Sequence, residues 1–305
     1  MNSRRLMIAT LAILCLAALP AAADEWNKTY KISGVAELRL DARDGNVRVT
    51  GADSPQIEAR ITAIDWRISE NEVRVVERQN GDRVEIEVKA PRLHGNGTGR
   101  WAIEIELHVP RNANLDIHSG DGNITAHGLA TRAARKEDGA LSTIAPAVAR
   151  QLAGPVRLAT GDGNITLEGA CGKISLRTGD GNITAAELDG AVDAQTGDGN
   201  VVVDGRFDEL RLRSGDGNLE ARVRPGSTMQ ASWDVHTGDG RVTLRLPEGF
   251  SADLDAHTGD GHISLAFPVT VSGRIDRSSV RGKMNAGGGL LTVRSGDGAI
   301  RIERL

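Results

Sequence analysis

Apolar residues alternate with polar ones on both sides of a short glycine-containing segment, and this unit recurs along the chain. Counted from a central aspartate, the apolar positions are −6, −4, +3 and +5; around Asp180 they hold Ile174, Leu176, Ile183 and Ala185. The same four positions are apolar around four further aspartates, namely Asp44, Asp216, Asp239 and Asp297. A period of two indicates a strand with one buried face, so each unit predicts two strands joined by a turn.

The turn between the two strands has a nearly constant sequence. Ser-Gly-Asp-Gly-Asn occurs at 119–123 and 214–218, and Thr-Gly-Asp-Gly-Asn at 160–164, 178–182 and 196–200. Variants at 237–241, 258–262 and 295–299 change only the fifth residue, while 44–46 and 138–140 hold weaker copies. So tight a reversal calls for positive φ, which glycine adopts without strain, and Asp or Asn side chains can bond their own turn amides. We therefore assign a structural turn role to Gly161, Asp162, Gly163, Asn164, Gly179, Asp180, Gly181, Asn182, Gly197, Asp198, Gly199, Asn200, Gly215, Asp216, Gly217 and Asn218.

Three successive spacings of 18 residues, from Asp162 to Asp216, set the size of one unit. In a β-solenoid each unit is one coil, its two strands lie in two facing parallel sheets, and the apolar positions fill the space between them. Longer spacings carry their extra residues at the opposite end of the strand pair, as Pro225-Gly226 and Pro247-Glu248-Gly249. We expect an all-β fold, a β-solenoid resembling a parallel β-helix of two-strand coils. The alternative is a β-sandwich of hairpin repeats, whose apolar faces would need a separate cover.

The chain divides into three parts by pattern. Residues 1–23 resemble a secretory signal peptide, with Arg4 and Arg5 before an apolar run and Ala21 to Ala23 before the expected cleavage site. Residues 24–110 form a looser β region or cap, with alternation at 73–76, 84–88 and 103–109 and an Asn80-Gly81 hairpin signal. Residues 111–305 are the solenoid repeat region. The best helix signal, at 129–135, is weak.

Export and composition limit the classes of function. Cleavage removes two basic residues and no acid, which leaves 35 basic against 41 acidic residues in the mature chain. That balance does not fit a nucleic-acid partner. No later segment is apolar enough to span a bilayer after cleavage, and Cys171 alone remains, so no intramolecular disulfide is expected. The 37 glycines and an aromatic content of 3% fit a narrow aliphatic interior with glycine turns.

Candidate chemistry is sparse, and we assign no catalytic residue and no cofactor. Stacked coils would align the carboxylates of Asp162, Asp180, Asp198 and Asp216, which repel unless neutralised, so calcium is a possible ligand for the row. The simpler interpretation is that each carboxylate bonds its own turn and faces water. Transition-metal binding by His236, His257 and His262 is a second hypothesis, since the first two share position −3 in consecutive copies. A solvated polar face explains them as well, because −3 points outward.

The lead-in Val109-Pro110, followed by Leu115, Ile117 and the turn at 119–124, resembles a bacterial adhesin-like family of unknown function built on glycine-rich β-strand repeats. The segment from Leu246-Pro247 to Ile263 repeats the pattern. The resemblance covers most of the mature chain. It implies a location in the envelope or at the surface, and it brings neither a defined ligand nor catalytic residues.

Together these features predict an exported, non-enzymatic, adhesin-like repeat protein that presents regular β faces to a partner. The partner would be an envelope or extracellular protein or polysaccharide, met in the periplasm, at the cell surface or outside the cell. One alternative is a periplasmic envelope scaffold or stress-response protein. The other is a polysaccharide-acting β-helix enzyme, which rests only on analogy with parallel β-helices.

Overall fold

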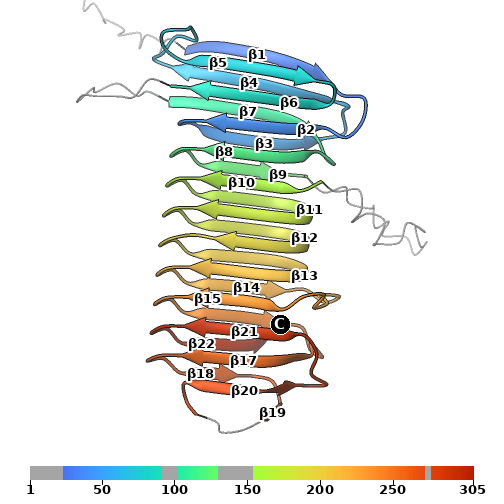
Figure 1. The fold of residues 1–305 in the computed structure, drawn as a ribbon, viewed down its shortest axis with the longest axis vertical. Helices are drawn as coiled ribbons and strands as arrows, with labels where there is room; N and C mark the ends of the chain where they lie inside the picture. The colour runs from blue at the N-terminus through green and yellow to red at the C-terminus, as the bar shows by residue number, and fades with distance from the viewer. Residues whose placement is uncertain (1–22, 91–101, 130–153, 272–275) are drawn as a thin grey trace, which may run out of the picture.

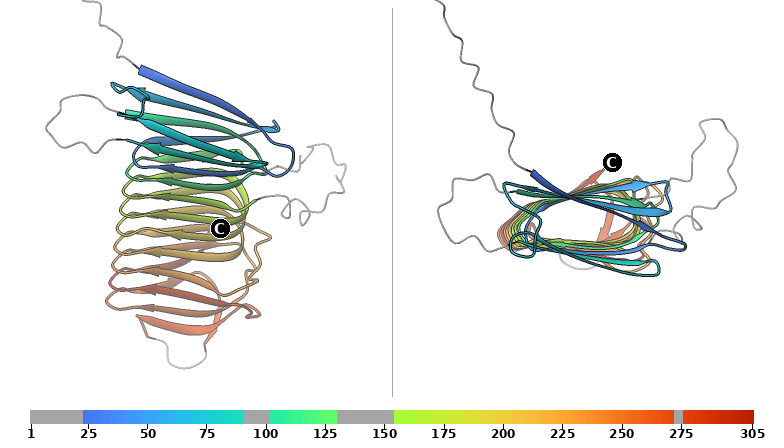
Figure 2. Two further views of the ribbon diagram at one scale, coloured as in Figure 1. Left: turned by 45° about the horizontal axis from the view of Figure 1, so that its top comes forward. Right: turned by 90° about the horizontal axis from the view of Figure 1, so that it is seen from above.

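The protein folds as a flattened solenoid of stacked β coils, in which two sheets face each other across a thin interior (Figures 1 and 2). The computed structural model describes residues 23–90, 102–129, 154–271 and 276–305, and the regular elements within them are all strands. Strand β11 (Ile165–Thr178) pairs in parallel with β12 (Ile183–Gln195), so that Ile165 lies beside Ile183 and Ile174 beside Val192. The predicted solenoid is confirmed, and the sandwich of hairpin repeats is wrong.

One sheet holds the strands that lead into the aspartate turns, together with β5, β6, β19 and β20 at the ends of the stack, and we call it the approach sheet. The long strands β11, β12 and β13 (Val201–Ser214) contribute their second halves to it. In stacking order its other strands are β5 (Arg74–Asn80), β6 (Arg83–Lys89), β2 (Glu37–Ala42), β8 (Asn114–Ser119), β10 (Val156–Thr160), β15 (Trp233–Thr237), β21 (Leu290–Ser295), β17 (Ala252–Thr258), β20 (Ser279–Met284) and β19 (Val269–Val271).

The second sheet holds the strands that leave the turns, together with β1, β4 and β7 at the N-terminal end of the stack, and we call it the departure sheet. It includes the first halves of β11, β12 and β13. In stacking order its other strands are β1 (Ala23–Lys31), β4 (Gln56–Ile64), β7 (Ala102–Pro110), β3 (Asn46–Ala52), β9 (Ile124–His127), β14 (Leu219–Val223), β16 (Val242–Leu246), β22 (Ile300–Arg304) and β18 (Ile263–Leu265).

A single hydrophobic core runs through the stack between the two sheets. The alternating positions chosen from the sequence are buried, with Leu176 and Ala194 both fully enclosed. Trp233 packs edge-on against Phe207 and tilted against Phe250, with ring centroids 6.3 Å and 5.2 Å apart. Aliphatic side chains thus fill most coils, and these three rings fill one part of the stack.

The coils at both ends of the stack do not follow the order of the chain. The coil of β21 and β22 comes last in sequence but lies between the coils of β15–β16 and β17–β18, so that Thr292 pairs with Asp234 on one side and Asp255 on the other. Similarly, Arg39 on β2 pairs with Glu85 on β6 and Asp116 on β8. At the C-terminal end the copies around Asp239 and Asp260 are consecutive in sequence but are separated by the coil of Asp297, whereas at the N-terminal end the copies around Asp44 and Asp121 are direct neighbours.

The N-terminal end combines antiparallel strands with one regular coil. Strands β5 and β6 form the predicted hairpin, in which Asn80 pairs with Arg83 and Gly81 has a φ of 61°. The Tyr30 hydroxyl on β1 donates to Glu77 on β5 and so joins the two sheets. Strands β2 and β3 nevertheless form a full coil of the solenoid, stacked on the coil of β8 and β9.

Some sequence-based predictions fall on residues that the structure does not describe. The signal peptide lies there except for Ala23, as do the weak turn at 138–140 and nearly all of the helix signal at 129–135. In the described part of the chain, no helix is long and apolar enough to cross a bilayer. Cys171 on β11 is buried.

Candidate functional site

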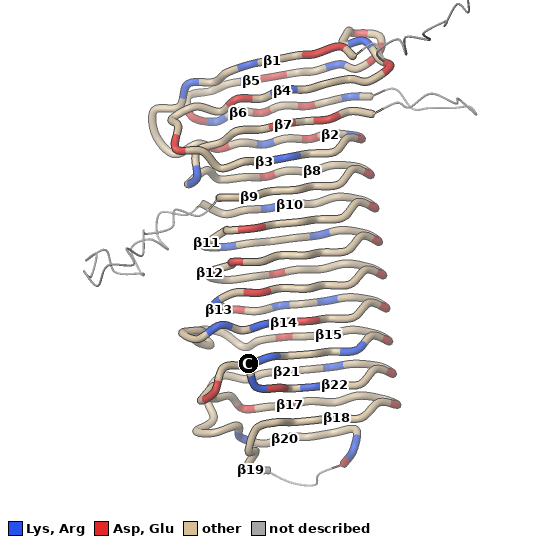
Figure 3. The backbone as a smooth tube through the Cα atoms, turned by 180° about the vertical axis from the view of Figure 1, so that it is seen from behind, with Lys and Arg blue, Asp and Glu red and all other residues tan. Residues whose placement is uncertain are grey.

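Nine aspartate turns stack along one edge of the solenoid, and acidic residues mark their tips in Figure 3. We call this row the aspartate edge. In stacking order it contains Asp44, Asp121, Asp162, Asp180, Asp198, Asp216, Asp239, Asp297 and Asp260. All but the half-buried Asp44 are exposed. The edge joins the decayed first copy to the eight strong ones in one continuous line.

The turn glycines are required by contact between coils rather than by backbone conformation. Of the sixteen glycines in the eight strong turns, all of them described, none has a positive φ, so that expectation is wrong. A Cβ built on Gly181 would lie 1.9 Å from the carbonyl oxygen of Gly163, and one on Gly179 would lie 2.6 Å from that of Gly161. Glycine is therefore needed because successive turns approach too closely for any side chain.

Two hydrogen-bonded ladders hold the turns in register. The buried Thr178 hydroxyl donates to the carbonyl of Gly163 at 2.8 Å and accepts the N–H of Gly181 at 3.2 Å, and other turns repeat the hydroxyl-to-carbonyl bond. In the second ladder, the N–H and the side-chain amide of each asparagine donate to the Oδ1 of the asparagine one coil away. Its members are Asn46, Asn123, Asn164, Asn182, Asn200 and Asn218. Sequence reasoning missed these roles, although identical residues at one repeat position were a signal for both.

The carboxylates of the aspartate edge have no hydrogen-bond or ion-pair partner among the described residues. They do not bond their own turn amides as expected, because the Thr or Ser hydroxyl receives the second glycine N–H instead. Burial and the neighbouring Asp121 carboxylate raise the pKa of Asp44. Within the described ranges no three His, Cys, Asp or Glu side chains converge as metal ligands, since each coil supplies one carboxylate.

The structure separates the histidines of the transition-metal hypothesis. Arg294 on β21 pairs with His236 on one side and with His257 on the other. The two histidines therefore stand two strand spacings apart, about 10 Å, with a cation between them. His262 follows the next turn, and its carbonyl accepts the N–H of Ile300. The hypothesis that the histidines form one cluster is wrong, because it assumed that the two copies stack on each other.

Outward side chains form rows along both sheets, and many of them pair across coils. On the approach sheet, Arg213 donates to Asp234 at 2.7 Å, and this bond and charge raise the pKa of Arg213. Asp255 accepts from Arg281 at 2.8 Å and from Arg294 at 2.9 Å. Burial alone would raise the pKa of Asp255, but the two guanidinium groups outweigh it and hold that pKa below its usual range.

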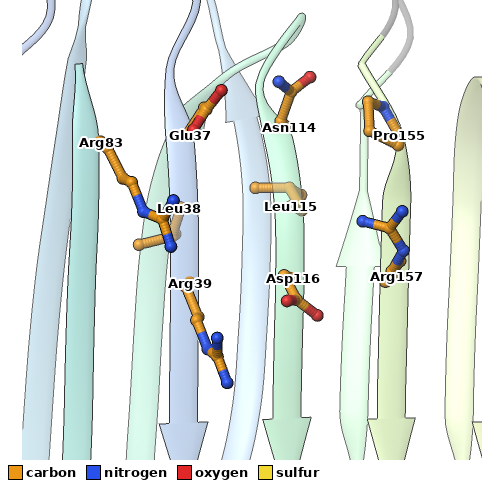
Figure 4. Close-up of a pocket in the computed structure, with 9 residues that line it drawn as sticks. All are labelled: Glu37, Leu38, Arg39, Arg83, Asn114, Leu115, Asp116, Pro155 and Arg157. Carbon is orange, nitrogen blue, oxygen red and sulfur yellow. The ribbon is translucent and has the colours of Figure 1, made fainter.

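A shallow polar pocket of about 220 Å³ lies on the approach sheet across β6, β2, β8 and β10 (Figure 4). Its floor lies over Leu38 and Leu115, whose side chains are buried. Six polar side chains surround the floor: Arg83, Glu37, Arg39, Asn114, Asp116 and Arg157. Arg83 is bound to Glu85 at 2.8 Å, whereas the side chains of the other five make no hydrogen bond or ion pair within the described chain. No sequence motif marked this pocket, because the pairing of β6, β2, β8 and β10 brings together residues that are distant in the sequence.

Comparison with known proteins finds one family and several solved structures. A family model described as Toastrack DUF4097 matches residues 35–303. No curated protein matches the chain. Among solved structures, a candidate adhesin from Parabacteroides merdae is similar at 12% identity and a TM-score of 0.46, covering 92% of this chain and 96% of that one. A candidate lipid-binding protein from Parabacteroides distasonis has the same identity and coverage at a TM-score of 0.45. A candidate cell adhesion protein from Clostridium sporogenes is 14% identical at 0.31, covering 93% and 100%.

Proposed function

The chain belongs to the Toastrack DUF4097 family, and from that premise we propose that it is an exported, non-enzymatic, adhesin-like protein of the bacterial cell envelope. Its role would be to hold a partner on the regular outer surface of the solenoid. The partner would be an envelope or extracellular protein or polysaccharide that repeats along its own length. Two features support the proposal: the N-terminal segment that resembles a signal peptide, and the regular geometry of the stack.

The observation that carries the proposal is the alignment of equivalent outward residues along the stack. Parallel pairing places Arg177 beside Gln195, and Gln195 beside Arg213, so side chains of one repeat position form a row spaced by about 4.8 Å. The asparagine and hydroxyl ladders keep that spacing constant. A rigid row offers a repeating partner many weak contacts at once, and such contacts add up to firm binding.

The first experiment measures binding of the mature chain, residues 24–305, to its own cells and isolated envelopes. Labelled protein should bind saturably, and excess unlabelled protein should displace it. Fractionation with an antibody against the mature chain should recover it from the envelope or the medium. Strictly cytoplasmic protein, or binding that never saturates, contradicts the proposal.

Two matched variants locate the surface that binds. The approach-sheet variant carries Arg177→Ser, Arg213→Ser and Arg294→Ser, and the departure-sheet variant carries Arg222→Ser, Arg245→Ser and Arg301→Ser. Each removes three outward positive charges, two exposed and one half-buried, so a general charge effect would weaken cell binding of both variants equally. We expect one of them to weaken cell binding several-fold more than the other. Equal retention in both would show that the rows on the sheets are not the binding surface.

A further inference from the structure

The pocket across β6, β2, β8 and β10 combines unpaired donors and acceptors on a flat, regular sheet. Arg39, Asp116 and Arg157 stand in one row of directly paired strand positions, so opposite charges are neighbours along it. No ion pair nevertheless forms between them. Elsewhere on the same sheet an Arg and an Asp at diagonal positions of adjacent strands do form an ion pair, as Arg213 and Asp234 show. The charged groups of Arg39, Asp116 and Arg157 are therefore available to bind a molecule outside the chain.

We propose that this pocket binds an acidic oligosaccharide, with sugar carboxylates on Arg39 and Arg157 and hydroxyl groups on Glu37, Asn114 and Asp116. The inference rests on the proposed binding function and names the ligand class of one site. The two arginines stand two strand spacings, about 10 Å, apart along the row. Guanidinium groups bind carboxylates through paired, charge-assisted hydrogen bonds.

The polar side chains around the pocket floor favour a sugar over other acidic polymers. Hydroxyl groups both donate and accept, so they can satisfy the carboxylates of Glu37 and Asp116 as well as the amide of Asn114. An acidic peptide brings carboxylates but few hydroxyls, and its charges would face Glu37 and Asp116 unbonded. The volume of about 220 Å³ is smaller than a usual drug-sized pocket, and the site crosses four strands. It suits a thin chain lying across the sheet.

The test is calorimetric titration of the mature protein with trigalacturonate, its methyl ester and triglutamate at about 150 mM salt, which screens distant charges. Trigalacturonate should bind saturably, and the uncharged ester and the peptide should bind at least about tenfold more weakly, as expected for lost charge-assisted bonds. The double variant Arg39→Gln, Arg157→Gln should weaken trigalacturonate binding by a similar factor.

The matched control is the double variant Arg211→Gln, Arg301→Gln. These arginines are exposed and unpaired among the described residues, and Arg211 occupies the same repeat position as Arg39 and Arg157. The control should bind trigalacturonate within about twofold of the parent. Equal loss in both variants, equal binding of triglutamate, or no saturable binding by the parent would overturn the inference. Cell binding measured on the same variants is independent, because its failure contradicts the proposed function whether or not trigalacturonate binds.

Discussion

Asn182 is tied to Asn164, one coil away, by two hydrogen bonds to a single oxygen. The main-chain N–H of Asn182 donates to Oδ1 of Asn164 at 2.8 Å, and its side-chain amide donates to the same atom at 3.2 Å. Asn200 repeats both bonds on Asn182. The repeated asparagine thus fixes the spacing between coils and keeps the outer faces of neighbouring coils in register.

Replacing Asn182 by Ala should destabilise the protein by about 1–3 kcal/mol. The change removes the side-chain bond to Asn164 and both bonds accepted from Asn200, and each such hydrogen bond contributes about 0.5–1.5 kcal/mol net. Urea unfolding of the mature chain measures it. The control is Thr184→Ala, an exposed outward position on β12 two residues after Asn182, which should change stability by less than about 0.5 kcal/mol. Similar effects from both changes would contradict a role for the ladder.

Substitution by alanine should destabilise the protein to different extents at two glycines, because glycine is required at the two positions for different reasons. At Gly181 a Cβ would lie 1.9 Å from the carbonyl oxygen of Gly163, so Gly181→Ala must push two coils apart and should cost more than about 3 kcal/mol. At Gly249 no atom lies within 4 Å, but φ is 83°, so Gly249→Ala should cost about 1–2 kcal/mol from backbone strain. Urea midpoints compare the two, and the reverse order would contradict the contact argument.

Removing charge from the aspartate edge should stabilise the protein. Like charges in neighbouring strand positions repel, so Asp180→Asn with Asp198→Asn should gain a few tenths of a kcal/mol at low salt. The gain should shrink as salt screens the edge. Thermal unfolding with chelator and then with excess calcium tests the remaining calcium hypothesis. If calcium raises the unfolding temperature of the parent but not that of the variant, the edge binds calcium. With calcium present, the variant would then be less stable than the parent, which is opposite to the predicted gain in stability.

The internal pattern of the coils could be predicted from sequence, because alternation is a local property. Leu176 and Ala194 are buried where the period of two places them. The order of the coils could not be predicted in the same way. Residues 290–304 carry the same repeat as their neighbours, so no local feature shows that they insert between β15–β16 and β17–β18.

The candidate surfaces were less accessible to sequence reasoning than the turns. The sequence identifies the aspartates of the edge, but the requirement for Gly181 depends on a distance between coils. Likewise, Arg39 and Arg157 lie more than a hundred residues apart and share a row only because β2 is stacked beside β8. Such sites can be recognised only once it is known which strands are neighbours in the stack.

Asp255 should contribute stability that depends on pH. Its pKa is lowered in the folded state by Arg281 and Arg294, which outweigh its burial. A lowered carboxyl pKa favours folding above the ordinary aspartate value of about 3.9, and that contribution is lost as pH falls through the folded pKa. Asp255→Asn should therefore cost about 1 kcal/mol at pH 7, and the difference from the parent should vanish in strong acid. Urea unfolding between pH 2 and 7 measures it, and a loss independent of pH would contradict the ion-pair explanation.

Engineered disulfides should reveal the order of the C-terminal coils. Directly paired positions on neighbouring strands lie about 4.8 Å apart, within reach of a disulfide, whereas positions two strands apart lie beyond it. His236→Cys with Arg294→Cys, and Arg294→Cys with His257→Cys, should therefore cross-link under mild oxidation. His236→Cys with His257→Cys should not, although these residues belong to consecutive copies of the repeat. Peptide mapping of the oxidised proteins identifies each bond and separates it from any bond to Cys171, which is buried. If the third pair cross-links as readily as the first two, the coil of β21 and β22 does not lie between the others.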